Sequence, residues 1–218
     1  MNYIIYHPIR CCTNVKRIGN VYHDSFKGNQ DPYIWNEQFL NSFCHITQID
    51  KHNGQFNFLV SRGRNDKYPN FEHLYCDLVF KVTSIHEWTN RNSITLNDPI
   101  VDNKQSFIHH YKKGVIQHPF KGEIRPKKRI TIKACKESSF QPQSEKQELI
   151  DIVPFLKTKG ITIEQLRSSI SLNSKGKVAF PSRPFKIEDK VAEELYEFLS
   201  KSKRKIFGKD LKNKYPKK

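Results

Sequence analysis

Apolar and polar residues alternate in short runs over the first part of the chain, which is the pattern of β-strands. Such runs occupy residues 3–6, 55–60, 74–85 and 129–135. The run at 74–85 is long and rich in β-branched and aromatic side chains, and the run at 55–60 follows the turn signal His52-Asn53-Gly54. We expect a strand in each of the four runs.

Residues 33–46 allow two interpretations. Ile34, Phe39 and Phe43 follow helical spacing and predict a helix. Trp35 and the same two phenylalanines are equally compatible with a packed irregular segment, so both alternatives stay open.

A helical pattern replaces the alternation after residues 138–143, which we expect to be a connection. Ser144 lies three residues before Gln147, the spacing of a capping box, and this predicts a helix over 145–157. Pro154 falls inside that helix and is expected to kink or shorten it. Gly160 is its stop signal.

Two further helices are expected downstream. Thr162 and Gln165 repeat the capping-box spacing ahead of a short apolar pattern. The strongest helical pattern follows the proline-rich residues 180–184, with one apolar stripe formed by Val191, Leu195, Phe198 and Leu199. The sequence therefore predicts an α+β fold: a mixed, mainly antiparallel sheet in residues 1–137, followed by a helical C-terminal part at 144–218.

Charge is distributed very unevenly along this framework. The chain of 218 residues carries a formal net charge of +16. Residues 111–136 hold nine basic side chains against Glu123 alone, and residues 201–218 hold nine against Asp210 alone. The other 174 residues carry 20 basic and 20 acidic side chains and are neutral. Concentrated positive charge attracts polyanions, and nucleic acid, either DNA or RNA, is the partner that it favours.

The basic strand at 127–133 has the alternation of a phosphate-binding ridge. Its odd-numbered positions would place cations in a row on one face and its apolar residues on the other. Such contacts supply affinity but carry no sequence information, whereas aromatic side chains nearby would stack on bases. The candidate phosphate-binding residues are Lys112, Lys113, Arg125, Lys127, Arg129 and Lys133, and the candidate stacking residues are Trp88, Tyr111 and Phe120.

Two other roles for this charge stay open. Lysines on an edge strand discourage aggregation without binding any ligand. A positive face also suits an acidic protein partner.

A nucleic-acid-processing enzyme is the competing functional class. A metal-dependent nuclease needs clustered carboxylates that hold Mg²⁺, and this is the only cofactor the sequence suggests. Lys81 lies four residues after Asp77, on the same face of a regular strand. The candidate catalytic residues are Asp77, Glu123, His109, His110 and His118. Their spacing does not match the usual nuclease pattern, and Asp77 is equally compatible with a buried, hydrogen-bonded residue.

The remaining patterns bear on cellular location. No apolar run reaches the roughly 18 to 20 residues that span a bilayer, and residues 1–8 lack the features of a secretory signal. The five cysteines are odd in number and irregularly spaced, as is typical of reduced thiols. We therefore expect a cytoplasmic protein with no membrane partner, and no pattern indicates its oligomeric state.

Overall fold

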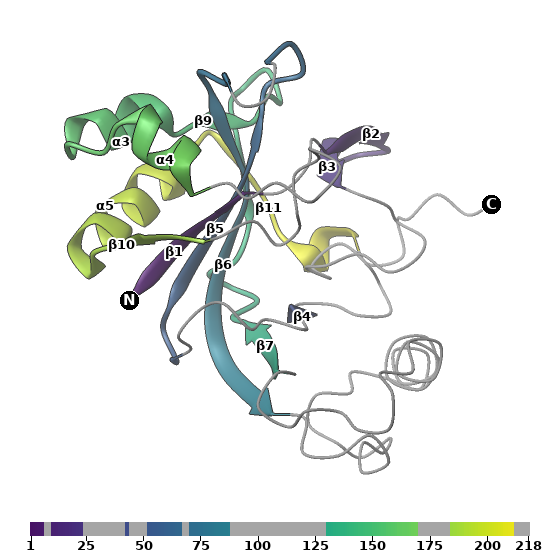
Figure 1. Cartoon of the computed structure of the whole chain (residues 1–218). Coiled ribbons are helices and arrows are strands. Elements are labelled where there is room, and N and C mark those ends of the chain that lie inside the picture. The colour runs from purple at the N-terminus through teal and green to yellow at the C-terminus, as the bar shows by residue number, and fades with distance from the viewer. Residues whose placement is uncertain are drawn as a thin grey trace, which may run out of the picture.

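The computed structural model describes residues 1–6, 10–23, 42–43, 52–66, 70–87, 130–169 and 184–211 (Figure 1). Its elements, in chain order, are β1 (Asn2–Tyr6), β2 (Cys11–Val15), β3 (Gly19–His23), β4 (Ser42–Phe43), β5 (Phe56–Arg62), β6 (Leu74–Glu87), β7 (Ile130–Ala134), β8 (Gln141–Gln143), β9 (Ile150–Asp151), α3 (Val153–Thr158), α4 (Ile163–Ser168), β10 (Phe185–Ile187), α5 (Asp189–Ser200), β11 (Arg204–Ile206) and the 3-10 helix η3 (Gly208–Leu211).

The main sheet is mixed and mostly antiparallel, which confirms the predicted α+β class. Its strand order is β10-β1-β5-β6-β7-β4, with β9 paired to β6 beside this path. The β1–β5 pair is parallel, and the other neighbours are antiparallel. Two small sheets accompany it, the β2–β3 hairpin and the β8–β11 pair. The four strands expected from alternation are all present, as β1, β5, β6 and β7.

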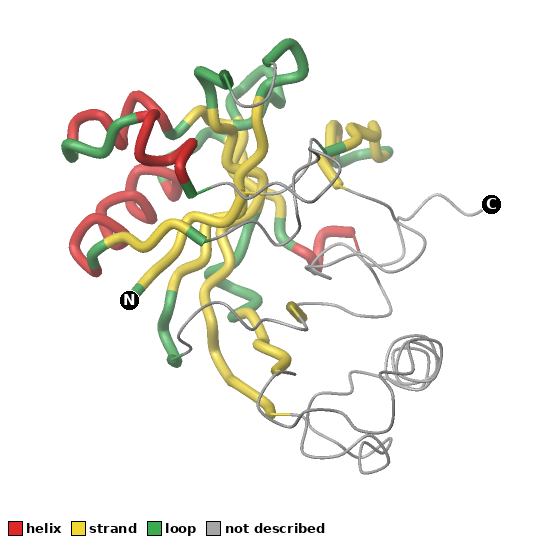
Figure 2. The backbone as a smooth tube through the Cα atoms, in the orientation of Figure 1, coloured by secondary structure: helices red, strands yellow, loops and turns green. Residues whose placement is uncertain are grey.

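Each face of the sheet carries its own hydrophobic core. On β1, Ile4 and Tyr6 belong to one core and Tyr3 and Ile5 to the other, so that the whole strand is buried. Because both faces of the sheet are covered at β1, its residues 3–6 are a continuous apolar run and do not alternate between apolar and polar residues. Helices α3, α4 and α5 gather on one side of the sheet, where they cover the first core (Figures 1 and 2).

The two predicted regions, 1–137 and 144–218, share this packing. The first core joins Phe58 and Val79 of the sheet to Leu156 of α3 and Leu195 of α5. Strand β10 also extends the main sheet, through its antiparallel pairing with β1. Residues from both regions therefore bury one another's apolar surface.

Strand β6 is the long central element of the sheet. One edge pairs with β5, and the other edge meets β9, then Phe140, then β7. The register with β5 shifts between Leu59, which faces Leu78, and Val60, which faces Cys76. Asp77 is the residue left over at this bulge, and bulges bend a strand and turn its side chains away from the regular alternation.

The region 138–151 differs from its prediction. Residues 141–143 are strand β8, because pairing with β11 organises a segment whose own pattern resembles a loop. The predicted helix over 145–157 is wrong for its first half. Gln147 bonds back to the Ser144 carbonyl in a turn and has a φ of 65°, and strand β9 follows. Helix α3 begins only at Val153, with Pro154 in its first turn, where proline is tolerated.

The helix signals farther along the chain are confirmed. Gly160 ends α3 with a φ of 74°, and both hydrogen bonds of the Thr162–Gln165 capping box open α4. Leu195 and Leu199 of the predicted α5 stripe are buried, whereas Phe198 is 39% exposed and stacks on Phe155.

The helix alternative for residues 33–46 is wrong at residues 42–43, which are strand β4 paired to β7. The rest of that segment lies outside the described residues. Among the described helices, none has the length and apolar character needed to cross a lipid bilayer.

Candidate nucleic-acid interface

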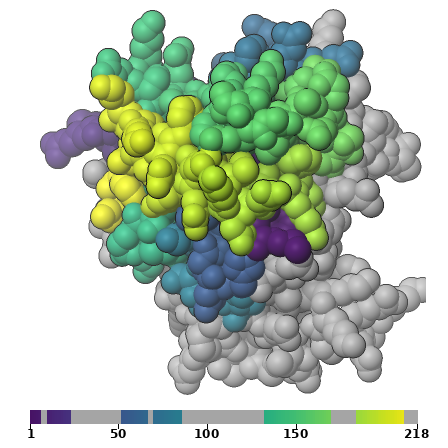
Figure 3. Space-filling view, turned by 90° about the vertical axis from the view of Figure 1, so that its left-hand side faces the viewer, coloured from purple at the N-terminus to yellow at the C-terminus, as the bar shows by residue number. Residues whose placement is uncertain are grey.

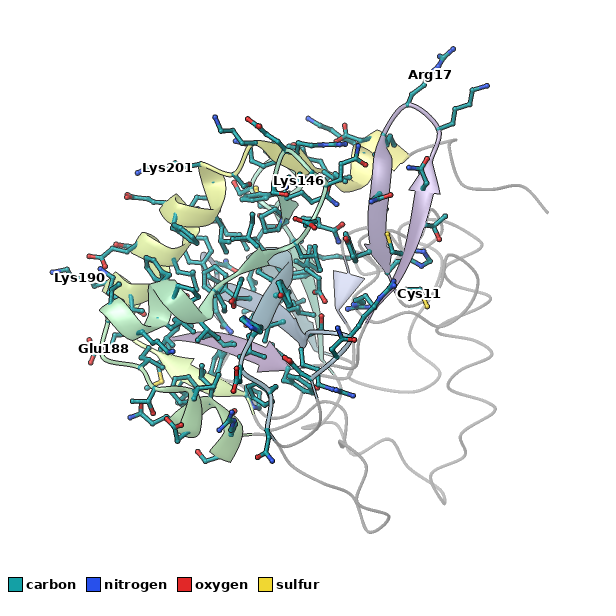
Figure 4. The ribbon with its side chains drawn as sticks, turned by 90° about the horizontal axis from the view of Figure 1, so that it is seen from above. Cys11, Arg17, Lys146, Glu188, Lys190 and Lys201 are labelled. Carbon is teal, nitrogen blue, oxygen red and sulfur yellow. The ribbon has the colours of Figure 1, made fainter. Side chains whose placement is uncertain are left out.

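The β2–β3 hairpin carries two cations at its tip. The Ile18 amide donates to the Val15 carbonyl at 2.9 Å and closes a tight turn around Lys16 and Arg17, both exposed. Arg17 has a φ of 68°, in the left-handed region, and Gly19 follows with a φ of 92°. The turn therefore holds both residues at the end of the hairpin, and the Arg17 side chain points away from its strands (Figure 4).

Glutamine side chains attach the hairpin to the body of the protein. The Gln141 carboxamide accepts from the Tyr22 amide at 3.0 Å and donates to the Tyr22 carbonyl at 2.9 Å. Gln143 donates to the Asn20 carbonyl at 2.7 Å, and Gln147 accepts from the Asn20 amide at 2.8 Å. These carboxamides bond the backbone of β3 as a neighbouring strand would, so the hairpin has a fixed position.

Tyr22 adds one more bond to this attachment. Its hydroxyl donates to the Gln147 carbonyl at 3.3 Å. Burial first, and then the neighbouring Cys12 thiol, raise the pKa of Tyr22 above its usual value. The phenol therefore stays protonated and remains a donor over the physiological pH range.

Residues 201–206, which lead from the end of α5 through strand β11, and the turn at 144–148 adjoin the hairpin. Arg204 pairs with Gln143 across the β8–β11 sheet, and its guanidinium donates to the Ile18 carbonyl at the hairpin turn. Lys203 lies 3.7 Å from Glu145, and both side chains are more than 70% exposed. Three segments far apart in the sequence are therefore joined by direct contacts.

We call the basic residues of these three segments the cation surface, and Figure 4 shows Arg17, Lys146 and Lys201 along the same side of the molecule. Only two carboxylates, Glu145 and Glu148, belong to the same segments. The exposed Lys203–Glu145 pair contributes little to stability, and the two carboxylates leave these segments with a net positive charge. The members are Lys16, Arg17, Lys146, Lys201, Lys203, Arg204 and Lys205.

Lys133 does not stand in an exposed row of cations, and that part of the prediction is wrong. Its side chain is only 9% exposed. The alternation correctly buries Ile132 and Ala134, but β7 lies between β6 and β4 and is an interior strand. Lys133 pairs in register with Ser84 and Ser42 on its two sides, so edge protection is not its role either.

The other predicted interface residues lie outside the described residues, and their roles stay predictions. They are the phosphate-binding candidates Lys112, Lys113, Arg125, Lys127 and Arg129 and the stacking candidates Trp88, Tyr111 and Phe120.

Asp77 lies in a buried ion pair. Its carboxylate is 3.4 Å from the Arg10 guanidinium, and the two side chains are 1% and 3% exposed. The Gln141 carboxamide also donates to the Asp77 carbonyl at 2.9 Å, which links the bulge to the hairpin attachment. Buried charges are normally paired in this way, so Asp77 has a structural explanation.

The bulge also separates Asp77 from Lys81, which a regular strand would place on one face. The Lys81 ammonium lies over the rings of Phe56 and Tyr196, against α5, at 5.2 Å and 5.8 Å from their centres. Asp77 instead meets Arg10, beside the hairpin. The carboxylate–lysine arrangement considered for a nuclease is therefore absent at these two residues.

No group of three or more His, Cys, Asp or Glu side chains comes together as a metal site within the part of the chain that the structure describes. The remaining candidates for the nuclease alternative, Glu123, His109, His110 and His118, lie outside that part.

The β2–β3 hairpin and the cations at its tip were not predicted from the sequence. The signal was available in the run Val15-Lys16-Arg17-Ile18-Gly19, where a glycine follows two cations between alternating segments. No sequence pattern predicts that Lys146 lies beside the hairpin, because only the contact between its turn and β3 brings it there.

Comparisons of the chain with protein-family models, with curated proteins and with solved structures gave no significant match.

Proposed function

We propose that this protein binds nucleic acid through the cation surface. The observation that supports the proposal is the direct contact between three distant segments, which together carry seven basic side chains and two carboxylates. Each lysine or arginine that neutralises a phosphate releases condensed counterions, so this arrangement provides affinity for a polyanion. The charge of residues 111–136 would add to the attraction.

The groups of the cation surface contact phosphates and not bases. Among the described residues, Met1 and Phe198 are the exposed large hydrophobic side chains, and neither belongs to the cation surface. Lysine and arginine bind phosphate oxygens irrespective of sequence. The cation surface therefore accounts for affinity and orientation.

The test is salt-dependent binding to fluorescent oligonucleotides, measured by anisotropy. The variant K146E/K201E reverses two cations of the surface, and the control K157E/K190E makes the same charge change at exposed positions on α3 and α5. We expect the first variant to flatten the slope of log affinity against log salt by about 2, since each lost phosphate contact removes about 1. The control should leave the slope close to that of the parent protein.

Equal effects of the two variants would mean that net charge alone governs binding, and the proposed surface would be wrong. Binding to acidic proteins with no affinity for oligonucleotides would favour the acidic-partner alternative. Thermal unfolding of each variant shows whether it is folded.

A further inference from the structure

The β2–β3 hairpin projects from the body of the protein. In the space-filling view it stands out beyond its described neighbours, and in the view from above Arg17 lies at its far end (Figures 3 and 4). Strand β3 is held along its length, by Gln141 at Tyr22, by Gln143 at Asn20 and by Arg204 at the Ile18 carbonyl of the turn. A protruding β-hairpin that is fixed in position and carries cations at its tip is suited to enter a groove of duplex nucleic acid.

The two faces of this ribbon differ in chemistry. Val15, Val21 and His23 are buried and point toward the body. The cross-strand partners Asn14 and Asn20 lie on the opposite face, and the Asn14 side-chain Nδ2 donates to the Asn20 side-chain Oδ1 at 3.2 Å. Cys12 and Tyr22 share this face nearer the root of the hairpin, where the Tyr22 hydroxyl donates to the Gln147 carbonyl. The part of the face next to the turn therefore presents the two uncharged asparagines, which suit contacts with base edges.

We infer that the hairpin enters the major groove of double-stranded DNA, with Lys16 and Arg17 at phosphates and Asn14 and Asn20 facing base edges. This inference depends on the proposed function. An asparagine carboxamide offers one donor and one acceptor, which match the N7 and N6 positions of adenine. The hairpin thereby supplies the sequence-reading element that the cation surface lacks.

The size of a two-stranded ribbon determines which nucleic-acid groove it can enter. The major groove of B-form DNA is about 12 Å wide and admits a two-stranded ribbon, whereas its minor groove is about 6 Å wide. The major groove of A-form RNA is deep and too narrow for side chains to read. The five residues of β2 extend over about 16 Å, at about 3.3 Å per residue, which matches roughly five base pairs.

The basic residues next to the hairpin are consistent with a position of the hairpin in the major groove. Arg204 lies against the hairpin turn through its bond to the Ile18 carbonyl, and Lys203 and Lys205 precede and follow it in the chain. When the ribbon lies in a groove, these cations would face the phosphates along its border. Phosphate contacts of this kind fix the register of the element that reads the bases.

The first experiment neutralises the tip with K16Q/R17N. Asparagine tolerates the left-handed backbone of residue 17, so the turn keeps its shape. We expect affinity for a 20-base-pair DNA duplex to fall roughly tenfold at 0.15 M salt, with the salt slope flattened by about 2. Binding to an RNA duplex of the same sequence, already weaker, should change less.

The second experiment identifies the groove and the reading residues. Methyl green, which occupies the major groove, should displace the protein from the DNA duplex, and netropsin, which occupies the minor groove, should not. The variant N14A/N20A should alter the sequences selected from a randomised duplex pool and leave the salt slope unchanged.

Three outcomes would overturn the inference and leave the proposed function standing: displacement by netropsin alone, equal affinity for DNA and RNA duplexes, or full affinity in K16Q/R17N when K146E/K201E has lost it. Absence of salt-dependent binding to any nucleic acid would overturn both.

Discussion

The variant D77N tests whether the buried ion pair at the β6 bulge is structural or catalytic. Asparagine keeps the size and shape of the side chain and removes its charge. Arg10, 3% exposed, would then lose the carboxylate charge 3.4 Å from its guanidinium. A structural role requires a loss of stability, whereas a catalytic role requires a loss of cleavage in a protein that is still stable.

The expected loss follows from the geometry of the pair. Two unit charges 3.4 Å apart attract by about 5 kcal/mol at an effective dielectric constant of 20. Desolvation of both groups offsets much of that attraction in the native protein. Removal of one partner of a buried pair typically destabilises a protein by about 3–5 kcal/mol, because the other charge stays buried. We expect D77N to lie in this range.

A double-mutant cycle isolates the pairwise term. The free energy of unfolding is measured by urea titration for the parent protein, D77N, R10Q and R10Q/D77N. We expect the double variant to be more stable than the sum of the single effects predicts, by about 2 kcal/mol, since both of its side chains are neutral. In thermal unfolding, D77N should lower the Tm by at least about 6 °C for a chain of this size.

A loss below about 1 kcal/mol in D77N, with no coupling to R10Q, would refute the reasoning about the pair. Magnesium-dependent cleavage that disappears in D77N with the Tm unchanged would instead support the nuclease alternative.

Two more predictions concern single positions. G19A should be destabilised more than G54A: both glycines have positive φ, but a Cβ at Gly19 would lie 2.2 Å from Gln147 Oε1, whereas nothing lies within 4 Å at Gly54. We expect a difference of about 1–3 kcal/mol in urea titration, and equal losses would contradict the described hairpin attachment. At His73, the hydrogen bond to Asp151, 2.8 Å away, raises the imidazole pKa. Protonated His73 therefore stabilises the fold below its unfolded pKa of about 6.5, and this stabilisation disappears as the pH rises through the higher folded value. Because the side chain is half exposed, H73N should remove well under 1 kcal/mol at pH 6 and nothing at pH 9, as measured by urea titration at both pH values.

The outcomes for individual elements show which structure is encoded locally. The strand at 74–85 was predictable because the run is long and rich in β-branched and aromatic residues. The capping box at Thr162 was predictable because its bonds join residues three positions apart. The helix predicted over 145–157 failed because the Ser144–Gln147 spacing that signals a cap also fits a turn. Strands β8 and β9, which frame that turn, depend on partners at residues 204–206 and 75–76.

The features of the candidate interface also separate into those that the sequence predicts and those that only the folded structure shows. The sequence by itself determined the excess of positive charge, its concentration in two segments and the burial of Ile132 and Ala134 in β7. Only the tertiary structure decided that Lys133 is enclosed by neighbouring strands, that a bulge turns Asp77 toward Arg10, and that Lys16 and Arg17 lie beside Arg204. Periodicity and capping act over a few residues and can be read along the chain. Register shifts and contacts between distant segments depend on how the chain packs, and no local pattern encodes them.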